Sequence, residues 1–294
     1  MSAKHKGHIK NQNLDRNRKV AVMRYLILLM TICFGLSMCS AGTIDPKVPD
    51  SKYVEYGKKH ECVVQICGEY PKQSIDGSKV CFLASSVIVR PRIVLTAAHV
   101  VEEAENMYIK LRDEEIKIST AIILKAYDKT KFGPFDLAIC YLEKDAFIDF
   151  YPELYDKDDE VGKVCSISGF GMTGNHRYGA KVHDGKKRAG SNIVDEICSG
   201  MLSCSVNKKP YTELEFLIAN GDSGGGLFID QKLAGINSTI MTHKGGTLNS
   251  DFQDQSCHTR ISLHKPWIDF VIEELEKAES IKNTRISNDL FDFL

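Results

Sequence analysis

The stretch that decides the fold runs from Asn220 to Phe228 and reads Asn-Gly-Asp-Ser-Gly-Gly-Gly-Leu-Phe. Ser223 lies between an acidic residue and three glycines, and an apolar run typical of a strand follows. Glycine adopts backbone angles that other residues avoid, so the N–H groups of such a turn can converge on a point beside the hydroxyl. Because serine is a weak nucleophile without a neighbouring base, the stretch predicts a catalytic serine only if the chain also supplies a base and an acid.

The composition allows one large domain or two small ones. The chain has 294 residues, a formal net charge of −1 and 43% hydrophobic residues, which is enough for a sizeable core. A net charge near zero argues against bulk electrostatic binding to nucleic acid. The basic residues that precede Tyr25 are interpreted as a solvated N-terminal extension.

Residues 1–41 are predicted to be an N-terminal extension plus a secretory signal peptide. The uncharged stretch Tyr25–Leu36 follows basic residues and precedes small ones, which is typical of a signal peptide. It is shorter than the roughly 20 apolar residues of a membrane span, so no stable membrane anchor is expected. We place the cleavage after Ala41 and expect a secreted, extracellular protein. Met23 is an alternative initiator, and an uncleaved signal-anchor is the other interpretation.

The cysteines favour an oxidising compartment. Eight of the ten remain after the signal is removed: Cys62, Cys67, Cys81, Cys140, Cys165, Cys198, Cys204 and Cys257. They permit four disulfides, whose connectivity the sequence leaves open. No C-x2-C pair suggests a metal site, and neither a metal nor a cofactor is expected.

The organisation after residue 41 indicates an all-β domain. Residues 42–52 are interpreted as a pro-segment or linker, and 280–294 as a C-terminal tail. From Tyr53 onward, short β-branched runs separated by turn residues favour a sandwich or barrel. An Asp-Gly hairpin signal lies at 73–78, where a disulfide between Cys67 and Cys81 is one candidate pairing. A helix is expected over 264–277, with Trp267, Phe270, Val271 and Leu275 on one face.

Three patterns stand in order along the chain: Leu95–Val100 (Leu-Thr-Ala-Ala-His-Val), Phe135–Ile139 (Phe-Asp-Leu-Ala-Ile) and the turn at Ser223. Acyl transfer to a serine uses these parts. Ser223 attacks the carbonyl, His99 takes and returns the proton, and Asp136 orients the imidazole. The backbone N–H groups of Gly221 and Ser223 are the candidate oxyanion hole.

These motifs resemble those of trypsin/chymotrypsin-type serine proteases. Cys165–Gly171 is similar to the family's C-x-x-x-G-W-G strand, with Phe170 for the tryptophan. The resemblance covers about residues 53–279. It implies two antiparallel six-stranded β-barrels with a C-terminal α-helix, and a site in the cleft between the barrels. It also implies a monomer that acts on proteins and peptides, with an activating protease and protein inhibitors as further partners.

The resemblance fails at the activation site. Mature family members usually begin Ile-Val-Gly-Gly, and the new amino group pairs with the acid that Asp222 matches. This implies a zymogen, but no Ile-Val-Gly-Gly occurs here. A cut between Lys52 and Tyr53 is the first candidate, and a cut before Ile44 is the second. The disulfides also depart, since the usual partner position of Cys165 holds Ile229.

The predicted substrate pocket departs as well. Trypsin-like members have an aspartate where this chain has Leu217, so a P1 Lys or Arg would be buried without a partner. We therefore predict an apolar P1 residue of small to medium size. Ser238 also resembles the serine that hydrogen-bonds the triad acid. The predicted pocket residues are Leu217, Ile218, Ser238, Thr239, Ile240 and Ser256.

Two hypotheses of different class follow. The first is a secreted serine endopeptidase made as a zymogen. The second is a catalytically weak or inactive homologue that acts as a binding or regulatory module. The complete triad favours the enzyme, while the missing Ile-Val-Gly-Gly keeps the second hypothesis open.

Overall fold

The computed structural model describes residues 42–73, 78–131, 133–206, 212–242, 248–252 and 254–291. The expected all-β class is confirmed, since strands make up most of the regular structure. The predicted signal peptide and the Asp-Gly turn lie outside the described residues. No helix in the described ranges has the length and apolar character that a membrane span requires.

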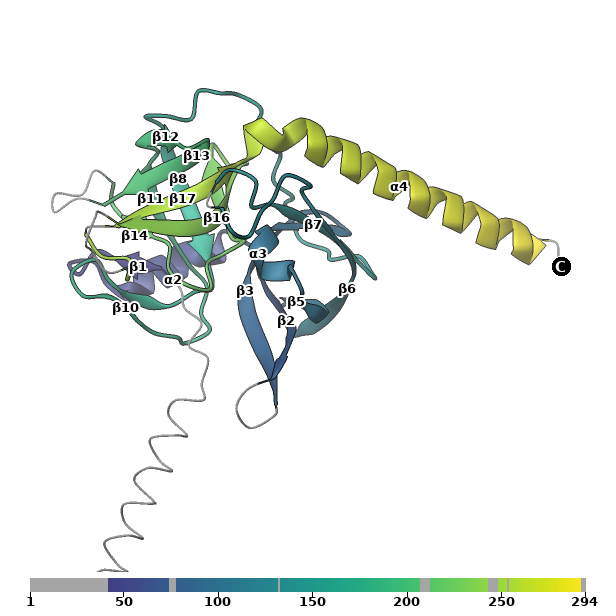
Figure 1. Ribbon diagram of the computed structural model, residues 1–294, viewed down its shortest axis with the longest axis horizontal. Coiled ribbons are helices and arrows are strands. Elements are labelled where there is room, and N and C mark those ends of the chain that lie inside the picture. The colour runs from purple at the N-terminus through teal and green to yellow at the C-terminus, as the bar shows by residue number, and fades with distance from the viewer. Residues whose placement is uncertain are drawn as a thin grey trace, which may run out of the picture. The chain divides into compact units, whose positions relative to one another are not determined.

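Six antiparallel strands close the first barrel in the order β2-β3-β4-β7-β6-β5 (Figure 1). The strands are β2 (Val63–Gln73), β3 (Lys79–Arg90), β4 (Ile93–Thr96), β5 (Glu105–Leu111), β6 (Glu114–Ile123) and β7 (Ala138–Leu142). Gln73 pairs with Lys79, which confirms the expected hairpin. The apolar runs predicted from sequence fill the barrel, and every side chain of β4 is buried.

The second half contains a seven-stranded sheet in the order β11-β8-β15-β16-β17-β13-β12, where a second closed six-stranded barrel was expected. Its strands are β8 (Val164–Gly169), β11 (Arg188–Ile193), β12 (Glu196–Cys198), β13 (Met201–Ser205), β15 (Gly226–Ile229), β16 (Lys232–Thr242) and β17 (Asp254–Arg260). Inward residues such as Ile167 and Leu227 form its core.

A four-stranded sheet adjoins this core in the order β10-β9-β1-β14. Its members are β1 (Thr43–Ile44), β9 (Thr173–Asn175), β10 (Gly179–Val182) and β14 (Phe216–Leu217). Residues 42–52 are therefore not a separate linker. Their first part is a strand that pairs with both β14 and β9.

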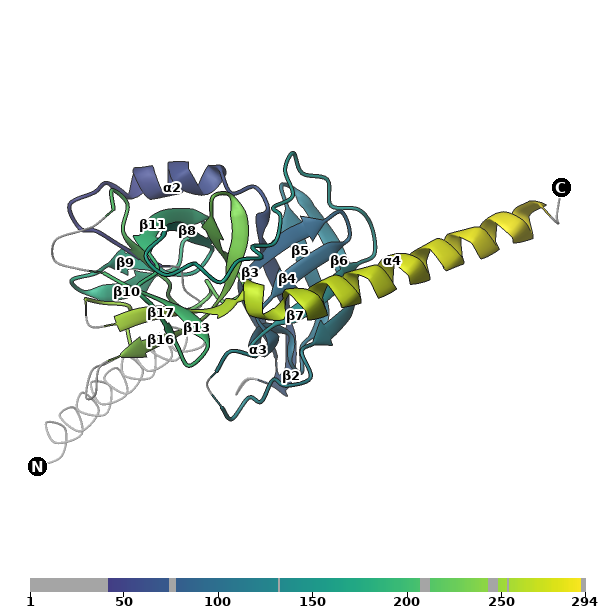
Figure 2. The same ribbon diagram turned by 90° about the horizontal axis from the view of Figure 1, so that it is seen from above.

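Helix α2 (Asp50–Lys58) follows β1 and lies against the second half beside β11 (Figure 2). The domain boundary expected at residue 53 thus falls inside a helix. Tyr53 is fully buried. Arg188, only 1% exposed, donates to the Asp50 carboxylate at 2.6 and 2.8 Å. The buried Tyr53 ring and the Asp50–Arg188 ion pair hold the helix against the domain.

Helix α4 (Ile261–Phe291) is longer than the predicted 264–277. Ile268, Val271 and Ile272 are buried in the core of the first barrel, whereas Phe270 is 62% exposed, against expectation. The Tyr141 hydroxyl donates to Glu279 at 2.6 Å. This contact ties the helix to β7.

No disulfide joins the cysteines of the described ranges. The suggested partners Cys67 and Cys81 are not opposite each other, because they pair with Leu83 and Glu69 respectively. The Sγ atoms of Cys165 and Cys204 lie 4.0 Å apart in the core of the second half.

Candidate active site

His99 and Asp136 are held by neighbouring strands. β4 and β7 pair antiparallel; His99 lies in the one-turn helix α3 (Ala98–Val101) after β4, and Asp136 lies just before β7. His99 Nδ1 is 2.7 Å from Asp136 Oδ2, and the His99 backbone N–H donates to Oδ1 at 2.9 Å. An imidazole that donates from Nδ1 presents Nε2 as an acceptor. The pair therefore has the geometry of an oriented general base.

Ser238 completes the surroundings of Asp136. A bulge in β16 between Asn237 and Thr239 turns the intervening side chain, and Ser238 Oγ donates to Asp136 Oδ2 at 2.6 Å. Burial raises the pKa of Asp136, but the hydrogen bonds from His99 and Ser238 outweigh it, so the pKa lies below its ordinary value. The carboxylate is therefore ionised at neutral pH.

The turn that carries Ser223 connects β14 and β15 and touches the first barrel. Gly224 has φ of 83°, and a Cβ there would lie 2.0 Å from Thr96 Oγ1 and 2.1 Å from the Ser85 carbonyl oxygen. Only glycine fits both the backbone angle and the space. This close approach places the turn of Ser223 against β3 and against the end of β4, the strand that leads to His99, and Ser223 and His99 line the same cleft.

The free N–H groups of the turn are those predicted for an oxyanion hole. In the described chain, Gly221 and Ser223 N–H have no hydrogen-bond acceptor, in contrast to the N–H groups of Asp222, Gly224 and Gly225. The Met172 N–H donates to the Asn220 carbonyl at 3.2 Å. Since the C=O and N–H of a trans peptide point in opposite directions, the Gly221 N–H is directed away from Met172 and is available to a ligand.

Ser85 in β3 is a site residue that the sequence analysis missed. Its N–H donates to the Ser223 carbonyl at 2.9 Å, and its Oγ donates to the Gly221 carbonyl at 2.8 Å. The same Oγ accepts from the Phe170 N–H at 2.9 Å. Ser85 thus hydrogen-bonds the turn at both Gly221 and Ser223 and holds it against β3. In the sequence, the only sign of this role is that Ser85 is a polar residue within a largely apolar strand.

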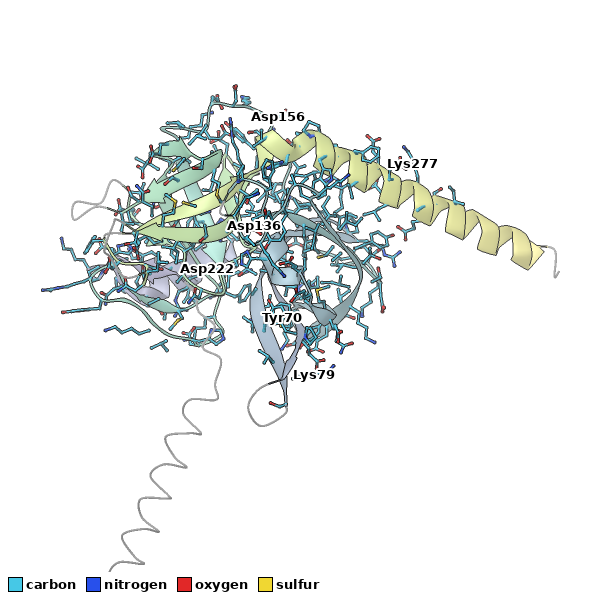
Figure 3. The ribbon with its side chains drawn as sticks, viewed as in Figure 1. Tyr70, Lys79, Asp136, Asp156, Asp222 and Lys277 are labelled. Atoms are coloured by element: carbon cyan, nitrogen blue, oxygen red, sulfur yellow. The ribbon has the colours of Figure 1, made fainter. Side chains whose placement is uncertain are left out.

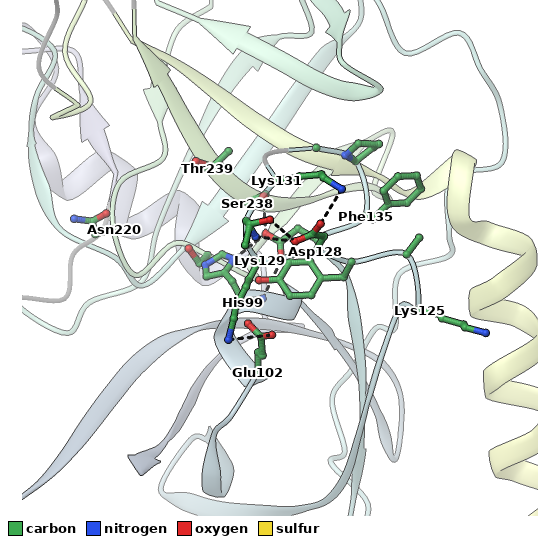
Figure 4. Close-up of a pocket in the computed structure, with 17 residues that line it drawn as sticks. His99, Glu102, Lys125, Asp128, Lys129, Lys131, Phe135, Asn220, Ser238 and Thr239 are labelled. Atoms are coloured by element: carbon green, nitrogen blue, oxygen red, sulfur yellow. Dashed lines mark hydrogen bonds and ion pairs between the residues drawn. The ribbon is translucent and has the colours of Figure 1, made fainter. Parts of the chain in front are cut away.

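His99, Asp136, Ser223 and Ser238 line one open cleft of about 1050 Å³ (Figure 4). Its other wall is the segment 125–131, where Lys129 pairs with Glu103 at 2.7 Å and Lys131 with Asp128 at 3.0 Å. Within the described ranges, no group of His, Cys, Asp or Glu side chains could hold a metal ion. The cleft offers acyl-transfer groups and room for an extended peptide.

The predicted pocket residues fall into two sets. Ser238 and Thr239 line the cleft. Leu217, Ile218 and Ser256 are at most 2% exposed, and the Ile218 N–H donates to Ser256 Oγ at 2.9 Å. Ile240, half-buried, packs against the core of the second half. The last four residues are thus packed within the second half and are not among the residues that line the cleft.

Asp222, labelled in Figure 3, is fully buried. Its carboxylate accepts N–H bonds from Gly171 at 2.9 Å and Ala219 at 3.0 Å, and also from the backbone of Gly42. No ion pair reaches it in the residues that the structure covers. Burial raises its pKa to about 7 despite these donors. Tyr53, the expected new N-terminus, lies instead within α2.

Comparisons with known proteins agree with this fold. A family model described as trypsin matches residues 71–268, more than half of the chain. The structure of mouse neuropsin, a serine protease expressed in the limbic system of the brain, aligns with a TM-score of 0.54 and 20% identity over 70% of this chain and 93% of its own. A structure of HL collagenase gives a TM-score of 0.57 and 15% identity over 73% and 94%. At these identities the two structures show the fold.

Proposed function

The chain belongs to the trypsin family of serine proteases, and on that premise we propose that it is a secreted serine endopeptidase that uses Ser223, His99 and Asp136. The observation that carries the proposal is the 2.7 Å contact between His99 Nδ1 and Asp136 Oδ2 in the cleft that Ser223 lines. The conserved fold alone would fit a binding module equally well; this constellation is what a hydrolase needs.

In the proposed mechanism, His99 Nε2 takes the Ser223 hydroxyl proton as the oxygen attacks the scissile carbonyl. Asp136 holds the imidazole in the Nδ1–H tautomer and stabilises the imidazolium that forms. His99 then returns the proton to the leaving amine, and a water molecule repeats the sequence to release the acyl group. Ser238 and the His99 backbone hold Asp136 ionised for this task.

The tetrahedral oxyanion would accept hydrogen bonds from Gly221 and Ser223. Their N–H groups have no acceptor in the described chain, so no internal bond must break before they act. One preorganised donor of this kind is typically worth about 3–4 kcal/mol of barrier. Ser85 supports both positions through the carbonyls of the same two residues.

The proposed substrates are proteins and peptides with an apolar P1 residue. Leu217 and Ile218 offer no carboxylate to a P1 Lys or Arg, and an unpaired buried charge is costly. The Ser256 hydroxyl accepts a hydrogen bond from the Ile218 N–H and so occupies the space beside this residue. A small or medium apolar side chain is the best match.

We also propose that the chain is made as a precursor whose Asp222 gains its partner by cleavage, as expected of a zymogen. The support is the signal-like sequence before residue 42 and the buried carboxylate without a cation. Export would also bring the folding chain into contact with oxidised dithiols before Cys165 and Cys204 become buried. Disulfide exchange would then join their Sγ atoms, with both thiol hydrogens ending on the reduced dithiol.

A fluorophosphonate probe tests the enzyme assignment. The secreted protein should be labelled on Ser223, and Ser223→Ala and His99→Ala should each abolish labelling. If correctly processed protein is not labelled, the enzyme proposal fails and the binding or regulatory homologue becomes the better description. Peptides with P1 Arg should be poor substrates.

A further inference from the structure

We propose that the cut that removes the signal peptide is also the cut that activates the enzyme, because it makes Gly42 the first residue and places its α-ammonium group against Asp222. The inference rests on the proposed function above, and it identifies the processing site. The activating enzyme would then be the secretory signal peptidase, so the mature protein would require no separate activating protease.

The position of Gly42 follows from the register of β1. Thr43 pairs with Leu217 and Ile44 with Phe216, so the antiparallel chain carries Gly42 alongside Ile218. The next residue, Ala219, donates its N–H to Asp222 Oδ2. The Gly42 nitrogen also donates to the same carboxylate. The nitrogen that would become the amino group is therefore already at the acid.

Gly42 is enclosed at this position. A Cβ on it would lie 2.1 Å from the Phe216 ring and 2.4 Å from the Leu217 carbonyl oxygen, so a side chain would be excluded. Thr43 is fully buried, and its Oγ1 donates to the Ser250 carbonyl at 2.5 Å. His176 contacts the Thr43 carbonyl at 3.0 Å through Nε2. The segment that holds the nitrogen is thus anchored independently of Asp222.

Cleavage would supply the missing cation. Small residues Cys39 and Ala41 stand three and one residues before the bond, the pattern of a signal-peptidase site. Hydrolysis adds water across the Ala41–Gly42 bond and gives an Ala41 carboxylate and a Gly42 ammonium. A buried carboxylate gains most from a charged donor at hydrogen-bond distance. Arg188 cannot take this role, because Asp50 and Asp184 already bind it.

The new ion pair would act on the catalytic turn through Asp222. This residue lies between Gly221 and Ser223, the two proposed oxyanion donors. Its carboxylate joins the turn to Gly171 and Ala219. An ionised, paired Asp222 holds the turn, whereas an unpaired one favours protonation or movement toward water.

The alternative cuts would damage the fold. A cut between Lys52 and Tyr53 divides helix α2. It also separates Asp50, which binds Arg188, from the rest of the domain. A cut before Ile44 divides β1. The bond before Gly42 leaves both elements whole.

The experiment uses the full chain with a recognition sequence for a site-specific protease inserted between Ala41 and Gly42, purified before cutting. Cutting makes Gly42 the first residue. In the matched control the sequence is inserted between Ser40 and Ala41, so that cutting leaves Ala41 attached. Fluorophosphonate labelling of Ser223 should rise on the order of 100-fold in the first protein and stay low in the control. This factor is the loss of rate that an enzyme typically shows when one oxyanion donor is misplaced.

Reductive dimethylation of the same two proteins in a Ser223→Ala background measures how accessible the N-terminal amino group is, and this measurement does not depend on catalytic activity. The Gly42 amine should resist formaldehyde in the folded protein, while the Ala41 amine of the control reacts. Protection without labelling in the active protein would support the Gly42 site and reject the enzyme proposal. Equal labelling of uncut, control and cut proteins, or a Gly42 amine as reactive as that of Ala41, would overturn the inference. A secreted protein that starts at Tyr53 would also overturn it.

Discussion

Ser85 and Ser86 are adjacent buried serines of β3 whose hydroxyls serve different partners. Ser85 Oγ bonds the nucleophile turn and Phe170, while Ser86 Oγ donates to the Val64 carbonyl at 3.3 Å on the neighbouring strand. Ser85 is therefore a positioning residue, whereas Ser86 belongs to the barrel. The two serines form a matched pair for mutagenesis.

We predict that Ser85→Ala lowers kcat about 10-fold or more and leaves KM within a factor of about three, because the oxyanion donors lose a support used mainly in the transition state. Ser86→Ala should leave kcat unchanged. Steady-state assays on one peptide measure both. An equal loss of kcat in the two variants, or a loss confined to KM, would contradict the role assigned to Ser85.

The proposed P1 preference assigns to Ile240 the role of limiting the size of the P1 side chain. Its branched side chain packs against the core of the second half, and the preceding residue, Thr239, lines the cleft. Ile240→Gly should raise kcat/KM for P1 Phe relative to P1 Val by about 10-fold, the range that a few methylene groups provide. Peptides that differ only at P1 make the measurement. An unchanged ratio would show that Ile240 does not border the P1 site.

At this scale the sequence pointed to the candidate triad but not to the residues that hold it in place. His99, Asp136 and Ser223 each lie in an extended motif, so their roles could be predicted. Ser85 and Gly42 lie in none. Their importance comes from the register of β3 and β1 with distant segments, which no local pattern encodes.

At the scale of elements, α2 shows where sequence periodicity fails. Only Tyr53 and Gly57 of its residues are buried, so no apolar stripe marks the helix. Its position depends on a single ring beside Phe216 and on the Asp50–Arg188 pair. A two-residue strand such as β1 is below the length that alternation can reveal. The barrel strands were predictable because their buried runs are longer.

Asp50→Asn tests whether this ion pair fixes α2. Arg188 is 1% exposed and would keep only Asp184, so we expect a loss of about 1–3 kcal/mol in the free energy of unfolding. Glu55→Gln, on the same helix, removes an exposed pair with Lys58 and should change it by less than about 0.5 kcal/mol. Urea unfolding of both variants in a Ser223→Ala background gives the comparison. Equal values for the two would argue that α2 is held by packing alone.

At the scale of the whole molecule, the half-buried His60 and the buried His176 and His258 make the fold sensitive to acid. Burial lowers the pKa of His60 and His176 to about 4 and that of His258 to about 3. All three contact polar atoms as neutral rings: His60 the Ser166 hydroxyl, His176 the Thr43 carbonyl and His258 the Asn237 amide oxygen. His60 contacts Ser166 in β8, His176 follows β9 and His258 lies in β17, so protonation should destabilise the second half of the domain.

The sign of the effect follows from proton uptake. Between about pH 6.5 and 4, the unfolded chain protonates these histidines and the folded protein does not, so the free energy of unfolding should fall as the pH is lowered through this range. Each histidine contributes up to about 1.4 kcal/mol per pH unit. In a chain whose Asp222 lacks a cation, its raised pKa works in the opposite direction over about pH 4–7, and a Gly42 ammonium would remove that opposition.

Urea unfolding of the Ser223→Ala protein at pH 7 and pH 5 should therefore show lower stability at pH 5. His176→Gln keeps a donor for the Thr43 carbonyl and removes the titrating ring, so it should reduce the difference between the two pH values. His183→Gln, at an exposed position, should leave the difference unchanged. The same measurement on the protein that begins at Gly42 should give a steeper loss than on the uncut chain, because only the uncut chain has the opposing Asp222. If the free energy of unfolding falls equally steeply in both forms as the pH is lowered, Asp222 titrates alike in both. That result would contradict a Gly42 ammonium partner for Asp222.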